Sequence, residues 1–474
     1  MLQKLPRENI RISNGINITV PSSVLLMTPY ILMEQLDWFE DEIMFIRKIL
    51  KRGDKVIDIG ANYGVYSLSM ALKVGNSGKV LAFEPTSYVA ECLANSIKVN
   101  NFRNTELIKA GLSDRSRKAV FFTSPNSELN SLYPEDSSEG SYETIELISL
   151  DSCIDKFNWD RIDFIKLDAE GEEANILNGA KNTITRFSPL IMFEFKHGAK
   201  LNIPLIDRFE SHGYKLYYLI PELALLVPFE RDKSFDSFLL NLFCCKDDKA
   251  RDLESQGVLI RSSTEIINAL QDIENNNNYL WREYLLRTPF SKPFINYWDN
   301  PDKSSFKSGW HSYQQALNLY VLSKSEENYP YKRMSYLNKA YNLLDELVKI
   351  DATFPRLISL ARCAFELGKR SYTVVTLSKI INNHSSSIQS LFIEPFLPVS
   401  KRYENVDPDN RPMEWVISSL LEQYEKLHAF SSYYTGTKSL PILKKLVSMG
   451  FQSQEMERRL HLIQKRFNTM SADQ

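Results

Sequence analysis

The sequence predicts an open parallel β-sheet with helices on both faces, followed by an all-helical C-terminal part. Four short apolar runs, at 56–58, 80–84, 164–168 and 190–194, alternate with segments of helical period. Such runs are typical of parallel strands buried on both faces, and their alternation with helices predicts βαβ units. After about Lys249 the strand-like runs stop and apolar residues recur at spacings of three and four. The chain is therefore predicted to join an α/β domain to an all-α domain of helical hairpins.

Length and composition exclude several classes of protein. A chain of 474 residues exceeds the size at which one hydrophobic core stops growing, so more than one domain is expected. With 57 basic and 59 acidic residues the net charge is −2, which leaves no broad positive surface for nucleic acid. The sequence has no apolar run of about 18 residues, so neither a signal peptide nor a membrane span is expected. The five cysteines show neither metal-ligand nor disulfide spacing, which predicts reduced thiols in a cytoplasmic protein.

Four segments are expected along the chain: an N-terminal segment with an entry helix, the α/β domain, a connection, and the helical domain. The entry helix is predicted at 38–50, with Gly53 as its C-cap. Four consecutive asparagines at 275–278 mark the connection as a linker. The boundaries of the four segments are 1–53, 54–250, 251–305 and 306–474.

Two further features are expected within the α/β domain. Residues 123–142 are rich in serine and poor in apolar residues, so they predict a surface loop or hairpin that covers the ligand crevice. The apolar runs 214–220 and 238–244 flank a region that contains proline, and they predict two antiparallel strands at one edge of the sheet.

A glycine turn follows the first strand. Residues 58–64 read DIGANYG and precede a helix, whose N-terminus presents free N–H groups. Gly60 and Gly64 allow the backbone to turn tightly and to approach a ligand. The spacing D-x-G-x-x-x-G lacks one glycine of the dinucleotide fingerprint, which disfavours a nicotinamide dinucleotide. Glu84 ends the second strand, where an acidic side chain accepts hydrogen bonds from a ribose diol.

The carboxylates at the ends of the four apolar runs are expected to converge, because ligands of such sheets bind outside the carboxyl ends of the strands. A crevice this acidic suits a cationic ligand that carries hydroxyls. The sulfonium and the ribose of S-adenosylmethionine fit that description. The four carboxylates belong to Asp58, Glu84, Asp168 and Glu194.

A third motif, KLDAEGEE at 166–173, ends the third run. Lys166 and Asp168 point to the same face of a strand, because side chains alternate along it. Asp168 and Glu170 are expected to take part in the reaction. Glu172 is interpreted mainly as a favourable acid in the first turn of a helix.

The three motifs together resemble the FkbM family of S-adenosylmethionine-dependent methyltransferases. The resemblance covers about the first 250 residues and rests on the turn at 58–64, on Phe83-Glu84-Pro85, and on 165–171 with Glu173 two residues on. It implies a Rossmann-like sheet of seven strands that O-methylates sugars, polyketides and related natural products. It also implies that Asp168 lies nearest the transferred methyl group. The cofactor-binding residues that it implies are Asp58, Gly60, Ala61, Asn62, Tyr63 and Gly64 at the methionine part, Glu84 with Pro85 at the ribose, and Gly111, Leu112 and Ser113 at the adenine.

The reaction implied is direct displacement, in which a substrate oxygen attacks the methyl group in line and loses its proton. Positioning supplies most of the catalysis, because the cofactor already carries an activated methyl group. The candidate bases are Asp168, Glu170, Glu194 and His197, and Lys166 would orient the nucleophile or pair with Asp168. As an alternative, Asp168, Glu170 and Glu194 could hold Mg²⁺, although no metal is predicted.

The helical half predicts an interaction domain of uncertain type. Residues 357–381 resemble a tetratricopeptide helix pair with Gly368 at the turn, but one fair repeat falls short of the roughly three that a solenoid needs. Trp281, Trp298 and Trp310 are expected to pack in a core rather than to form a saccharide platform.

We therefore expect an S-adenosylmethionine-dependent O-methyltransferase that acts on a hydroxyl of a glycan or sugar-containing metabolite. Its helical half would recognise a protein partner or a polymeric acceptor. Two alternatives remain open at this point: an interaction protein whose α/β half is a non-catalytic binding module, and a nicotinamide-dependent sugar oxidoreductase.

Overall fold

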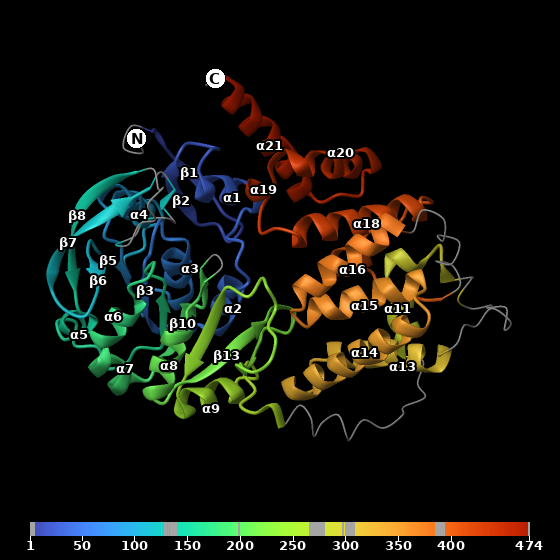
Figure 1. The fold of residues 1–474 in the computed structure, drawn as a ribbon, viewed down its shortest axis with the longest axis horizontal. Helices are drawn as coiled ribbons and strands as arrows, with labels where there is room; N and C mark the ends of the chain where they lie inside the picture. The colour runs from blue at the N-terminus through green and yellow to red at the C-terminus, as the bar shows by residue number, and fades with distance from the viewer. Residues whose placement is uncertain are drawn as a thin grey trace.

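The computed structural model describes residues 5–124, 126–127, 130, 132, 140–197, 200–264, 280–295, 298, 309–383 and 394–472. An eight-stranded sheet with the order β14-β13-β15-β10-β9-β3-β4-β5 forms the centre of the N-terminal half (Figure 1). Its strands are β3 (Lys55–Ile59), β4 (Lys79–Phe83), β5 (Thr105–Ile108), β9 (Phe164–Leu167), β10 (Leu190–Glu194), β13 (Lys215–Ile220), β14 (Leu225–Pro228) and β15 (Asn241–Cys245).

The four predicted apolar runs form neighbouring parallel strands, as expected. Strand β3 pairs with β4 on one side and with β9 on the other, and β10 pairs with β9. In this register Ile59 lies beside both Phe83 and Leu167, so the three strands end at the same level. The chain therefore delivers the residues that follow each strand to one edge of the sheet.

Both faces of the sheet are covered by helices, because alternate strand residues enter two different cores. Val56 packs in one core with α2 (Glu42–Ile49), α3 (Val65–Val74) and α4 (Ser87–Val99). Ile57 packs in the other core. The second core is covered by α5 (Leu150–Ile154), α6 (Glu173–Asn178), α7 (Lys181–Phe187) and α8 (Ile203–Ser211).

The antiparallel edge confirms the two strands predicted after residue 210 and adds one more. Strand β15 inserts between β10 and β13 and runs antiparallel to both. After β13, the short 3-10 helix Pro221–Leu223 and Ala224, which has a positive φ of 46°, reverse the chain. Strand β14 then pairs with β13 as a hairpin. The α/β class is as predicted, and the sheet has eight strands rather than seven because of this hairpin.

The N-terminal segment contains more structure than the single helix predicted. A hairpin of β1 (Arg7–Arg11) and β2 (Asn17–Pro21) and the helix α1 (Met27–Gln35) precede α2. The prediction that Gly53 caps the entry helix is wrong. The helix ends at Leu50, whose backbone is extended, and Gly53 lies in the following turn, where its N–H donates to the Val74 carbonyl at 2.9 Å.

A second, three-stranded sheet flanks the carboxyl edge of the large one. It has the order β6-β8-β7. Strands β7 and β8 pair antiparallel and border the segment 123–142, as the hairpin prediction requires. The remaining elements of this half are β6 (Gly111–Leu112), β7 (Arg117–Thr123), β8 (Ser141–Ile148), β11 (Lys196–His197), β12 (Lys200–Leu201) and α9 (Asp247–Ser255).

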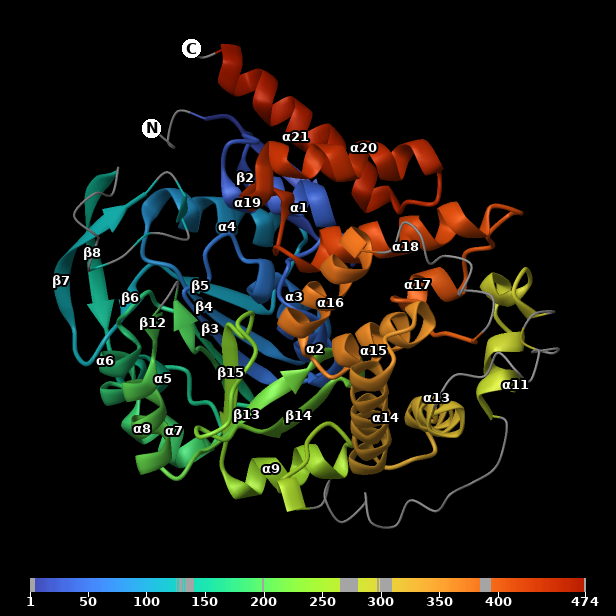
Figure 2. The ribbon, with the colours of Figure 1, turned by 45° about the vertical axis from the view of Figure 1, so that its right-hand side comes forward.

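The C-terminal part is all helical in its described residues and packs against the antiparallel edge of the sheet (Figure 2). Ile220, Leu225 and Val227 of the β13–β14 hairpin belong to the same hydrophobic core as the helices. The helices are α11 (Leu280–Leu286), α13 (Trp310–Lys324), α14 (Pro330–Ile350), α15 (Phe354–Glu366), α16 (Arg370–Asn383), α17 (Lys401–Glu404), α18 (Pro412–Leu427), α19 (Ser432–Thr435), α20 (Leu440–Met449) and α21 (Gln454–Ala472), with short 3-10 helices at Pro289–Ser291 and Gly436–Ser439.

The helix pair predicted at 357–381 is α15 and α16, and Gly368 lies at the turn with a positive φ of 73°. Trp281 and Trp298 are buried in the helical core and Trp310 packs against it, so the core interpretation of these side chains is confirmed. The asparagines at 275–278 lie outside the described residues. All five cysteines are buried free thiols. Among the described helices, none combines the length and the apolar character that a membrane crossing requires.

Helices from the two ends of the chain lie side by side. Helix α21 contacts α1, and both lie beside α19 (Figure 1). The Glu34 carboxylate accepts hydrogen bonds from the backbone N–H and the hydroxyl of Ser432, and the Arg458 guanidinium donates to the Glu34 carbonyl at 2.7 Å. The contacts that attach the helical domain to the α/β half therefore include the sheet edge and the N-terminal helix.

Candidate active site

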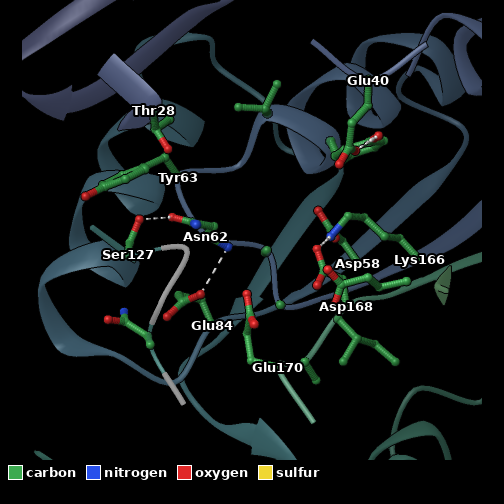
Figure 3. Close-up of a pocket in the computed structure, with 18 of the residues that line it drawn as sticks. Thr28, Glu40, Asp58, Asn62, Tyr63, Glu84, Ser127, Lys166, Asp168 and Glu170 are labelled. Atoms are coloured by element: carbon green, nitrogen blue, oxygen red, sulfur yellow. Dashed lines mark hydrogen bonds and ion pairs between the residues drawn. The ribbon is translucent and has the colours of Figure 1, made fainter. Parts of the chain in front are cut away.

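A cavity of about 680 Å³ lies at the carboxyl edge of the parallel strands. Its floor comes from residues that end or follow β3, β4, β9 and β10. Residues 126, 127, 130 and 132 of the 123–142 segment line one side of it, as predicted. Figure 3 shows how the polar side chains of this cavity gather around the end of the sheet. The predicted convergence of the four strand ends is therefore present.

The glycine turn after β3 is shaped by contacts within the protein. Gly60 has a positive φ of 77°, and a Cβ at this position would lie 1.8 Å from the backbone oxygen of Asp168. Gly64 has a φ of 89°, and a Cβ there would lie 2.3 Å from Leu93. The sequence interpretation attributed both glycines to close approach of a ligand. The structure shows a different reason, because the end of β9 and the helix α4 occupy the space that side chains would need.

The Glu84 carboxylate is buried at the end of β4 and connects two turns. It accepts hydrogen bonds from the backbone N–H of Asn62 at 3.0 Å and from the backbone N–H and hydroxyl of Thr86 at 2.9 and 2.6 Å. Burial raises the pKa of Glu84, and these donors partly oppose the shift. A carboxylate has about four acceptor positions, so one remains for a ligand hydroxyl after these three bonds. The side chain of Asn62 in turn accepts a hydrogen bond from Ser127 at 2.9 Å.

Lys166 lies between two carboxylates at the centre of the site (Figure 3). Its ammonium donates to Asp168 at 2.8 Å and lies 4.0 Å from Asp58 Oδ1. Burial opposes the charge on this ammonium, but the carboxylates of Asp168 and Asp58 outweigh it and raise the pKa of Lys166. The Asp58 side chain is fully buried and accepts a hydrogen bond from Ser67 at 2.5 Å through Oδ2. Its Oδ1 is buried and accepts no hydrogen bond from the described residues.

Glu170 and Glu194 complete the acidic floor. Glu170 has a positive φ of 50°. Burial, followed by the charges of Asp168, Glu194 and Glu173, raises the pKa of Glu170 to about 10. Glu170 therefore holds its proton at neutral pH, which weakens the expectation that it serves as the base.

Two of the predicted cofactor-binding residues do not line the cavity. Ala61, Tyr63, Pro85, Gly111 and Leu112 line it, whereas Gly64 and Ser113 do not. The Ser113 side chain is fully buried, and its hydroxyl donates to Glu172 at 2.5 Å. The Arg117 guanidinium donates to the same carboxylate at 3.2 Å. Glu172 thus serves an internal network, although it lines the cavity as well.

Two further predictions concern His197 and a metal site. The side chain of His197 lies outside the described residues. Within the described ranges, no group of three or more His, Cys, Asp or Glu side chains could hold a metal ion, so Asp168, Glu170 and Glu194 do not form such a group.

The sequence interpretation missed the wall of the cavity that faces the helical domain. Thr28 and Glu40 from the N-terminal segment line it, together with Phe430 from the α18–α19 connection and Tyr433 and Tyr434 from α19. The Tyr66 hydroxyl donates to Glu40 at 2.5 Å, and burial raises the pKa of Glu40. The only local signal was the aromatic character of the sequence AFSSYYTG at 429–436, which does not show where that segment packs.

Comparisons with known proteins address the α/β half. The Methyltransferase FkbM domain matches residues 58–216. The methyltransferase sdnD of Sordaria araneosa is 28% identical over 211 residues, which cover 38% of this chain and 73% of that protein. Two solved structures are more distant. The FkbM methyltransferase of Methylobacillus flagellatus KT is 17% identical over 42% of this chain and 45% of its own, with a TM-score of 0.29. A Streptococcus mutans methyltransferase in complex with SAH is 12% identical over 43% and 95%, with a TM-score of 0.26.

The assignment of this half to a family rests on the domain match and on the sdnD relative. The match begins at Asp58 and includes all three motifs, the glycine turn, Glu84 and the 165–171 segment. It confirms the resemblance drawn from those motifs, together with the enzyme class and the cofactor S-adenosylmethionine that the resemblance implies. Residues 58–216 form a methyltransferase domain of the FkbM type.

Proposed function

We propose that this enzyme transfers a methyl group from S-adenosylmethionine to a hydroxyl oxygen of a glycan or sugar-containing metabolite. The observation that carries the proposal is the convergence of Asp58, Glu84 and Asp168 on one cavity beside the glycine turn. We further propose that the enzyme acts in the cytoplasm, and that its helical domain, which has a tetratricopeptide-like hairpin, also serves recognition. The proposed domain boundaries remain those predicted from the sequence.

The residues present fit the cofactor. Asp58 Oδ1 is a buried acceptor without a hydrogen-bond partner among the described residues, and it suits an ammonium group. Glu84 has one acceptor position left, which suits a ribose hydroxyl. We propose that Gly60, Ala61, Asn62 and Tyr63 hold the methionine part, and that Pro85, Gly111 and Leu112 border the adenine. When bound, S-adenosylmethionine supplies an activated methyl group, so the protein mainly binds, orients and moves a proton.

Asp168 is the best candidate for the base. Its carboxylate is 37% exposed and lies in the cavity, whereas Glu170 holds its proton at neutral pH. Lys166 fixes the orientation of Asp168 through the 2.8 Å contact. Since a sugar hydroxyl is a weak acid, a carboxylate within about 3 Å of it would accept the proton as the oxygen attacks. Glu194 is the second candidate, at the end of the neighbouring strand.

Three measurements test the proposal. Isothermal titration with S-adenosylhomocysteine should give heat and a single site, and the absence of binding would favour the alternative of a non-catalytic interaction module. Titration with NAD should give no heat, and binding of NAD alone would favour the oxidoreductase alternative. A transfer assay with tritium-labelled S-adenosylmethionine against cell-wall glycans and sugar metabolites should then identify the acceptor.

A further inference from the structure

We propose that the helical domain completes the acceptor site of this enzyme, and that the acceptor is a neutral sugar ring without a phosphate group. The inference rests on the methyl transfer proposed above and specifies its substrate. Four of the aromatic side chains that line the cavity on the side of the helical domain come from three distant segments, and we call these four the aromatic wall. They are Phe39, Phe238, Phe430 and Tyr434.

Three of the four rings of the aromatic wall are in contact with one another through Phe430. The ring centroids of Phe39 and Phe430 are 5.0 Å apart, and those of Phe238 and Phe430 are 5.5 Å apart. Phe430 is thus the central member, and it comes from the helical domain. Tyr434 is 53% exposed, and its hydroxyl donates to Met27 Sδ at 2.8 Å. Because these rings belong to segments up to about 400 residues apart, the wall exists only when the two domains are packed together.

The wall is held in place by hydrogen bonds behind it. The Arg370 guanidinium lies 4.3 Å from the Phe238 ring centroid and 4.5 Å from that of Phe430. It donates to the backbone carbonyls of Leu427 and Ala429 at 2.8 and 3.0 Å. The Gln35 amide donates to the Phe430 carbonyl at 2.7 Å. A surface fixed in this way needs little ordering when a ligand binds, which favours affinity.

The charge of the cavity selects the kind of acceptor. The described lining contains seven carboxylate side chains and two lysines. The charge of Lys166 is balanced by Asp168, to which it donates, whereas Lys196 donates one N–H to the neutral Ser237 carbonyl at 2.6 Å. Even without Glu170, which holds its proton, the acidic side chains outnumber the lysines of the described lining, so a phosphate group would meet net repulsion. The carboxylates are at residues 40, 58, 84, 168, 170, 172 and 194.

The aromatic wall and the acidic floor of the cavity together fit a sugar ring. Carboxylate oxygens accept hydrogen bonds from hydroxyls, so an acceptor that lacked hydroxyls would leave these buried groups without water and without donors. Aromatic rings bind flat apolar surfaces, and a sugar ring presents its C–H groups on one face. A neutral sugar can therefore contact the aromatic wall with one face while its hydroxyls reach the acidic floor. A phosphorylated sugar or an apolar natural product satisfies only one of the two surfaces.

The experiment uses the full-length enzyme, labelled S-adenosylmethionine and pairs of acceptors. Each pair contains a methyl hexoside or a trisaccharide and its 6-phosphate. The neutral members should be methylated with kcat/KM at least about tenfold above their phosphates, a difference of about 1.4 kcal/mol. With the best neutral acceptor, Phe430→Ala and the more exposed Tyr434→Ala should each raise KM about tenfold. S-adenosylhomocysteine affinity should stay within about twofold. Phe467→Ala, at a 56% exposed phenylalanine of α21, is the matched control.

The outcomes separate this inference from the function on which it rests. Preference for the phosphorylated members, or no transfer to any neutral member, overturns the inference while binding of S-adenosylhomocysteine leaves the methyltransferase function intact. An unchanged KM in folded Tyr434→Ala and Phe430→Ala removes the aromatic wall from the acceptor site. Absence of both cofactor binding and methyl transfer would instead contradict the proposed function.

Discussion

Two groups of buried carboxylates, one around Arg362 in the helical domain and one in the α/β cavity, differ in how their charge is balanced. In the helical domain, Arg362 donates to Glu366 at 2.7 Å and forms an ion pair with Glu404 at 2.9 Å. Burial opposes ionisation there, yet Arg362 and Lys324 lower the pKa of Glu366. In the α/β cavity, the pKa values of Glu84 and Glu170 are raised, with burial as the largest cause.

The difference indicates what each set of charges does. A buried carboxylate with a matching guanidinium stabilises one arrangement of helices, and removing the partner leaves an uncompensated charge. Carboxylates gathered without enough cations destabilise the protein, and such clusters are typical of functional sites. The seven carboxylates and two lysines of the cavity belong to the second kind. The following predictions test that distinction, from the largest expected effect to the smallest.

Asp168→Asn should have the largest effect, and on turnover rather than on folding. Removal of a general base lowers kcat by about 10²- to 10⁴-fold. The amide can still contact Lys166, so the midpoint of thermal unfolding should change little, and S-adenosylhomocysteine affinity should stay within about threefold. Steady-state transfer of labelled methyl groups measures kcat. Asp160→Asn, at a 71% exposed carboxylate, is the control. Full activity of Asp168→Asn would exclude Asp168 from the proton transfer.

Arg362→Ala should lower the stability of the fold, in contrast to Asp168→Asn, which should lower turnover. It leaves Glu366 and Glu404 buried without their guanidinium, which costs about 3–5 kcal/mol of unfolding free energy. Urea denaturation followed by circular dichroism measures the loss. Arg287→Ala removes an exposed pair with Glu283 and should cost about 0–1 kcal/mol. Equal costs for the two arginines would contradict the structural role assigned to the buried network.

Glu84→Ala should weaken S-adenosylhomocysteine binding by about 1–3 kcal/mol, because the ribose loses a charge-assisted acceptor. Isothermal titration measures this change. Glu84 also accepts hydrogen bonds from the Asn62 and Thr86 backbones. Glu84→Gln should therefore lose less binding free energy than Glu84→Ala, because the amide keeps one acceptor oxygen. Glu91→Ala, at an exposed site on α4, is the control. Unchanged affinity in folded Glu84→Ala would mean that the ribose lies elsewhere.

The parts of the site that local sequence could predict are those built by neighbouring parallel strands. Asp58, Glu84 and Asp168 each follow or end a short apolar run, and parallel pairing brings such ends together without further information. Glu170 was also identified, but its raised pKa depends on the burial and the charges that packing creates. Ser113 was misplaced, because adjacency to Gly111 and Leu112 does not show that the chain turns its hydroxyl inward to Glu172.

The aromatic wall could not be predicted in the same way. Phe39 was assigned to the entry helix, and Phe430 carried no motif. Their contact depends on the docking of α1 against α19 and α21, through bonds such as that between Glu34 and Ser432, over about 400 residues of sequence. No local periodicity encodes a contact of that range. The same limit applies to the additional hairpin strand β14, which depends on a left-handed backbone at Ala224.

The smallest effect is expected for Glu170→Gln, and it concerns the pH dependence of stability. A carboxyl group whose pKa is raised from its usual 4.5 to about 10 binds a proton in the folded state while the unfolded chain releases it. Folding stability contributed by this group therefore falls as the pH rises above about 4.5. Glutamine has no proton to release, so the variant should match the native protein near pH 4.5 and exceed it by about 2–4 °C in Tm at pH 5.5, one pH unit higher. Calorimetric scans at both pH values measure the difference, with Glu146→Gln at an exposed position of β8 as the control. A variant that is less stable than the native enzyme at pH 5.5 would show that Glu170 is ionised and paired, which would return it to the candidates for the base.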